Sequence, residues 1–67
     1  MPTDLDVRRS AQVLIREHRD AAPIRAAMRA DATAKDGDLE GYEVWRRIVR
    51  AVDELLSKDV PAGTETH

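Results

Sequence analysis

The sequence predicts an all-α fold: a small three-helix bundle, or a helical hairpin plus a helix, with a disordered C-terminal tail. Apolar residues recur at spacings of three and four, the period of an amphipathic helix. Capping residues and a glycine mark where these segments start and stop. The last residues contain proline and glycine without any period. We expect one helical domain over 1–58, with helices at about 4–18, 21–35 and 39–57, and a tail at 59–67.

Length and composition restrict the function. A chain of 67 residues holds one small domain, whose buried area barely offsets the entropy lost on folding, so self-association is expected to add stability. The chain has no cysteine, which removes disulfides, Cys-based zinc sites and thiol catalysis. Its net charge of -2 gives no overall attraction for polyanions. With no secretory signal or long apolar run, we expect a cytoplasmic protein without membrane contact.

The first helix has a clear start and one apolar face. Thr3 and Asp6 have the spacing of a capping box, in which each side chain binds the backbone amide of the other residue. Its inward face is predicted to contain Val7, Ala11 and Leu14, with Ile15 and His18 beside them.

The second helix is rich in alanine. Pro23 suits a first helical turn, and Asp20 just upstream is expected to cap it. Gly37 is expected to take the left-handed conformation that stops the helix, and Asp38 to cap the next one. The predicted inward face is thin: Ile24, Ala27, Met28 and either Ala32 or Ala34.

The third helix carries the strongest apolar pattern. Its residues suit either the core or an interface with a partner, and they are Tyr42, Trp45, Ile48, Val49, Val52 and Leu56. Trp45 has the largest apolar surface in the chain, and aliphatic residues one turn away on both sides favour the core for it over an interface.

No group of residues predicts catalysis. Nucleophilic catalysis needs a base beside the nucleophile, but Ser10 and His18 are two helical turns apart. Asp36 and Asp38 suggest a calcium loop, yet Arg47 stands where that loop needs a glutamate. We therefore expect no enzyme activity, no catalytic residue, no metal site and no cofactor.

Nucleic-acid binding is the alternative function. It would use arginines of the second and third helices, namely Arg25, Arg29, Arg46, Arg47 and Arg50. A helix-turn-helix built on Gly37 would need apolar side chains where Glu43 and Arg46 stand. Nucleic acid is for this reason the less favoured partner.

Several runs together resemble a class of short uncharacterised alphaproteobacterial proteins, which form a domain-of-unknown-function family. These runs are LIREH at 14–18, AAPI at 21–24, AAMRA at 26–30, and Gly37-Asp38 followed by Gly41, Trp45 and Ile48. The resemblance covers roughly 13–56 and implies three helices with a Gly-Asp turn and a tryptophan-bearing last helix. Members often carry glycine after the histidine, where this chain has Arg19. The family implies no activity.

The preferred functional prediction is a protein–protein interaction or self-associating adaptor module. It depends on the mismatch between the apolar third helix and the alanine-rich second helix, which is too thin to cover it. A homodimer or one protein partner is expected to use the remaining apolar surface.

Overall fold

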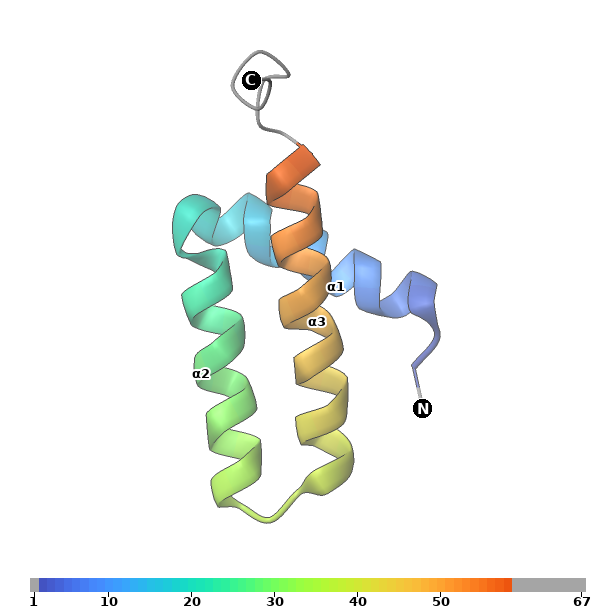
Figure 1. The fold of residues 1–67 in the computed structure, drawn as a ribbon, viewed down its shortest axis with the longest axis vertical. Helices are drawn as coiled ribbons and strands as arrows, with labels where there is room; N and C mark the ends of the chain where they lie inside the picture. The colour runs from blue at the N-terminus through green and yellow to red at the C-terminus, as the bar shows by residue number, and fades with distance from the viewer. Residues whose placement is uncertain (1, 59–67) are drawn as a thin grey trace.

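The computed structural model describes residues 2–58, which are helical almost throughout (Figure 1). Helix α1 spans Asp4–His18, a 3-10 turn η1 spans Arg19–Ala21, α2 spans Ala22–Lys35 and α3 spans Leu39–Lys58. The prediction of an all-helical fold is confirmed for this range, while the predicted tail at 59–67 lies outside it. Among the described helices, none combines the length and the hydropathy that a membrane span requires.

The helices are arranged as a hairpin with one helix across it. α2 and α3 lie side by side in opposite directions, and α1 crosses behind them (Figure 1). The core lies where α1 meets the hairpin, and its buried residues are Val7, Ala11, Ala22, Ala26, Ile48 and Val52. Of residues 2–58, no helix lies over the opposite face of the hairpin.

Helix α1 begins as the sequence predicts. The Thr3 hydroxyl accepts a hydrogen bond from the Asp6 amide at 3.2 Å, and the Asp6 carboxylate accepts one from the Thr3 amide at 3.3 Å. Val7 and Ala11 are buried, with Leu14 packed against the core. The predicted capping box and inward face of this helix are confirmed.

The connection between α1 and α2 has an unusual backbone. Arg19 has φ 51° and ψ -121°, a region that glycine adopts far more readily than other residues, and its amide donates to the Ile15 carbonyl. The prediction that Asp20 caps the second helix is wrong. The residue preceding α2 is Ala21, without a side-chain cap, because the 3-10 turn runs directly into the helix from Arg19.

The connection between α2 and α3 is a Schellman turn. Gly37 has φ 77°, the Asp38 amide donates to the Thr33 carbonyl at 2.9 Å, and the Gly37 amide donates to the Ala34 carbonyl at 3.0 Å. The Asp38 carboxylate then accepts from the Gly41 amide at 2.9 Å, so it caps α3. The predicted glycine stop and aspartate cap are confirmed.

The predicted inward face of the second helix is wrong. The structure buries Ala22, Ala26 and Ala30, whereas Ile24 is 64% exposed and Met28 55% exposed. The other predicted positions, Ala27, Ala32 and Ala34, are exposed as well. Residues four apart lie on one helix face, and a stripe of alanines lets α2 approach its neighbours closely, a closeness that larger side chains would prevent. Contact distance, rather than side-chain size, therefore selects the buried face.

Candidate interaction surface

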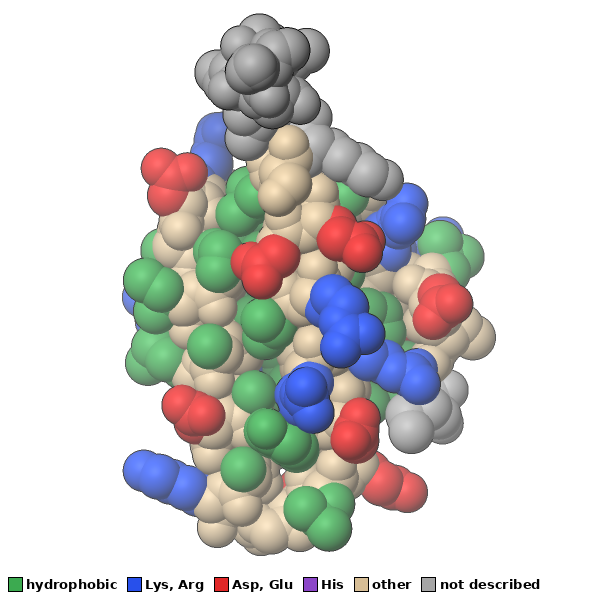
Figure 2. All heavy atoms as spheres, viewed as in Figure 1, with side chains coloured by type: hydrophobic (Ala, Val, Ile, Leu, Met, Phe, Trp, Pro, Cys, Tyr) green, Lys and Arg blue, Asp and Glu red, His purple; other side chains and the backbone are tan. Residues whose placement is uncertain are grey.

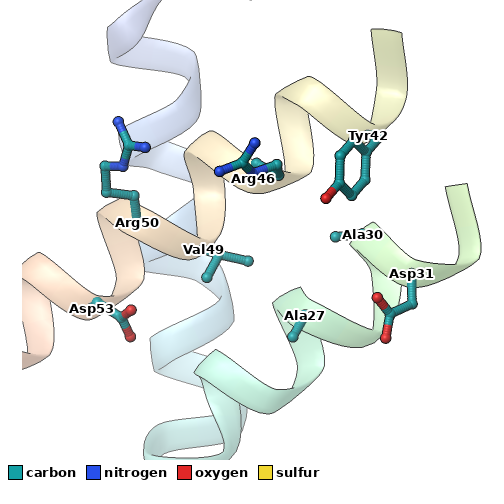
Figure 3. A pocket seen from close by; sticks show the side chains of 8 residues that line it. All are labelled: Ala27, Ala30, Asp31, Tyr42, Arg46, Val49, Arg50 and Asp53. Carbon is teal, nitrogen blue, oxygen red and sulfur yellow. The ribbon is translucent and has the colours of Figure 1, made fainter. Parts of the chain in front are cut away.

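The hairpin face that α1 leaves uncovered contains a groove of about 340 Å³ between α2 and α3 (Figure 3). We call it the open groove. Its lining residues are Ala27, Ala30 and Asp31 of α2 and Tyr42, Arg46, Val49, Arg50 and Asp53 of α3.

Small and apolar side chains form the floor of the open groove. Ala27 and Ala30 lie on one side, and Val49 and Tyr42 on the other (Figure 3). Ala30 is buried, while Val49 and Tyr42 are half-buried. The Arg46 guanidinium lies 5.8 Å from the centre of the Tyr42 ring, a cation–π arrangement that holds both side chains at the edge of the groove.

The two walls of the open groove differ in charge. Asp31 lies on the α2 wall, whereas Arg46 and Arg50 lie on the α3 wall, with Asp53 at one end (Figure 3). Within residues 2–58 the one ion pair under 4.0 Å joins His18 Nε2 and Glu17 Oε1, at 3.9 Å. Inside the described chain, then, Asp31 and Arg46 have no carboxylate–guanidinium partner.

Exposed apolar side chains extend this surface along α2. Ile24 belongs to the α2 surface outside the core, whereas the exposed Met28 lines the cavity beside Trp45, and the view of the uncovered face shows apolar side chains over α2 and along its boundary with α3 (Figure 2). Charged side chains surround them (Figure 2). An apolar strip bordered by charges is typical of a surface that binds another protein.

The structure divides the predicted core or interface residues of the third helix. Ile48 and Val52 are buried in the core. Tyr42, Trp45, Val49 and Leu56 are half-buried. Tyr42 and Val49 line the open groove, whereas Trp45 lines a separate cavity, where the Arg29 guanidinium lies 5.5 Å from its ring centre.

The structure does not bring the five predicted arginines together. All are exposed. Arg46 and Arg50 line the open groove, while Arg25 and Arg29 line a cavity of about 520 Å³ that also includes Trp45 and residues of α1. Arg47 lines a third cavity, between α1 and α3, together with Arg50 and Arg8. Sequence reasoning did not single out Arg8, because its place beside Arg47 depends on how α1 crosses the hairpin.

Sequence reasoning also missed Asp31 as a member of the surface. Its signal was present: Asp31 follows Ala27 by four residues, so the two share one side of α2 next to the alanine stripe. Among residues 2–58, no three His, Asp or Glu side chains lie close enough to hold a metal ion. What the open groove offers chemically is apolar contact flanked by charge, which suits binding.

Comparisons with protein-family models, with curated proteins and with solved structures found no match to this chain.

Proposed function

We propose that this protein is a self-associating protein–protein interaction module without catalytic activity, folded as a three-helix bundle, and that the open groove is its contact surface. Membership in the alphaproteobacterial class it resembles, and a cytoplasmic location, belong to the same proposal. The observation that carries the proposal is how the apolar side chains are distributed between core and surface.

The core is built from small side chains. Of its buried apolar residues, Val7, Ile48 and Val52 are larger than alanine, and Val52 is the largest that is fully buried. Burying one such aliphatic side chain contributes about 1.5–3 kcal/mol, whereas an alanine methyl contributes about 0.8 kcal/mol. A core of this kind gives a monomer little stability.

Apolar side chains larger than alanine, which are few in the core, also lie on the surface. Ile24 is more than half exposed on α2, and Val49 and Tyr42 are half-buried at the groove. Covering these side chains in a complex would bury apolar area comparable to that of the core's larger residues. Association therefore supplies stability that the monomer cannot reach by itself.

Nucleic-acid binding has less support from the geometry. Arg25 and Arg29 lie in a different cavity from Arg46 and Arg50. A phosphate backbone needs arginines along one continuous surface. We treat nucleic-acid binding as an outcome of the test below rather than as a second proposal.

The test measures the molecular mass of the protein in solution as a function of its concentration. Sedimentation equilibrium over a hundredfold range of concentration is expected to show a dimer at high concentration, with a melting temperature that falls on dilution. Ala27→Glu places a charge on the groove floor and is expected to yield a monomer.

Ala32→Glu is the matched control. Ala32 is also an exposed alanine of α2, but it lines the cavity beside Trp45 instead of the open groove, so its variant should associate normally. A wild-type protein that stays monomeric throughout would refute the proposal. Binding to DNA or RNA that weakens steeply with salt, and is lost in Arg46→Ala with Arg50→Ala, would favour the alternative.

A further inference from the structure

We infer that the occupant of the open groove is a second copy of this chain, related by a two-fold axis parallel to α2 and α3, so that Asp31 of each copy pairs with Arg46 of the other. The inference rests on the proposed self-association and adds its symmetry and its specificity-determining residues.

The first support is the opposite charge of Asp31 and Arg46 on the two groove walls. Asp31 lies on the α2 wall, and Arg46 with Arg50 on the α3 wall (Figure 3). A two-fold interface brings one surface against itself, so the surface must be self-complementary. Asp31 on one wall and Arg46 on the other meet this requirement when each wall faces the other wall of the partner. Asp53 also belongs to the α3 wall, but it lies seven residues, about two helical turns, beyond Arg46 and away from the partner's Asp31.

The second support is the relative height of the two residues along the hairpin. Counted back from the turn between Lys35 and Leu39, Arg29 is level with Trp45, whose ring its guanidinium reaches. Because α2 and α3 run in opposite directions, Asp31 is level with a position about three residues before Arg46. That offset is about 4.5 Å, less than one helical turn and within reach of an arginine side chain.

The symmetry axis follows from these two facts. A two-fold axis parallel to the helices keeps every residue at its height and exchanges the sides, so α2 of one copy faces α3 of the other. Asp31 then meets Arg46 twice, once in each direction. An axis perpendicular to the helices would place α2 against α2 and put like charges together, which costs binding energy.

The apolar floor fits the same arrangement. In a pair of facing hairpins, Val49 of one copy comes within one turn of the height of Ala27 of the other, and the small alanine leaves room for the valine. Two hairpins packed in this way form a four-helix core with α1 of each copy on the outside.

A charge-swap experiment tests the inference. Asp31→Arg and Arg46→Asp each place like charges opposite one another twice, and each is expected to raise the dimer dissociation constant by about tenfold or more. An equimolar mixture of the two variants restores both pairs, so a heterodimer of wild-type affinity is expected, and the double variant on one chain should dimerise with itself.

The controls carry the same charge changes outside the groove. Asp20→Arg and Arg9→Asp alter exposed residues of η1 and α1, and both are expected to dimerise as the wild type does. Restored affinity in the mixture also shows that each single variant is folded.

The outcomes separate the two proposals. If the wild type dimerises and Ala27→Glu disrupts the dimer, but Asp31→Arg and Arg46→Asp do not weaken it, this symmetry is overturned and the proposed function stands. The same holds if both single variants are monomeric and the mixture is monomeric too. A monomeric wild type would overturn both.

Discussion

The two faces of the α2–α3 hairpin carry similar apolar side chains but differ in what covers them. On one face, α1 lies over Ala22, Ala26, Ile48 and Val52, and these residues are buried. On the other, Ala27 and Val49 line the open groove. Alanines of α2 and a valine of α3 occur on both faces, so composition alone does not distinguish core from surface. The position of α1 does.

Within residues 2–58, α1 is the one helix that packs across the hairpin, and it covers one of the two faces. An antiparallel helix pair has two apolar sides when small residues occur all around it, and α1 covers one of them. No helix of the described part of the chain covers the other side. The same substitution should therefore have different effects on the two faces.

The largest expected effect comes from the same substitution made on each face. Val52→Ala removes the largest fully buried side chain and should cost about 2 kcal/mol of unfolding free energy, from lost burial plus a cavity. Val49→Ala, three residues earlier on the same helix, should cost less than about 1 kcal/mol in the monomer, because Val49 is only half-buried there, but it should weaken association. Urea unfolding at several protein concentrations measures both. Equal losses at low concentration would erase the distinction between the faces.

A backbone change at the hairpin turn should weaken both faces together. Gly37 has φ 77°, and a Cβ there would meet nothing within 4 Å, so Gly37→Ala introduces backbone strain alone. The expected cost is about 1 kcal/mol, measured by thermal unfolding. Gly37→Asn is the control and should cost less, since asparagine tolerates this conformation better. An alanine variant as stable as the wild type would contradict the Schellman turn.

The smallest effect should be a gain, on the covered face alone. Arg19→Gly relieves a positive φ at the residue that turns the chain from α1 into α2. We expect the variant to be more stable by about 0.5 kcal/mol, since glycine's larger unfolded-state entropy offsets part of the relief. Arg16→Gly, inside α1, should instead destabilise by about 1 kcal/mol. Slower hydrogen exchange of the α1 amides would show that the gain in stability strengthens the packing of α1 on the hairpin.

Local signals predicted the ends of the helices well. The Thr3–Asp6 box, the Gly37 stop and the Asp38 cap each depend on residues within four positions of one another. Such signals need no tertiary contact, so a sequence reveals them directly. The wrong cap at Asp20 has the complementary reason: α2 starts from a 3-10 turn after Arg19, whose φ is positive. The local residues gave no signal for that conformation, which was indicated only by the glycine that similar proteins often carry at this position.

The buried face of the helix was predicted well for α1 and poorly for α2. Polar residues fill the positions between Val7 and Ala11, so the apolar period of α1 selects one face, and the apolar Leu5 and Val13 outside that period are exposed. α2 has apolar residues on nearly every side, and choosing by size favoured Ile24 and Met28 over the alanines. For the candidate surface, sequence identified Tyr42, Val49 and the arginines, but not that Arg46 would share a groove with Asp31.

By itself, the sequence determined that residues 2–58 are helical, and its capping signals determined where α1 starts, where α2 ends and where α3 starts. Periodicity, capping and size are local or additive properties, and a linear pattern records them. Only the tertiary structure decided which stripe of α2 is buried, which side of the hairpin α1 covers and which charges meet at the groove. Those depend on how closely the helices approach and on the angle at which α1 crosses, and both are set by the turn at Arg19 and by packing between residues distant in the chain.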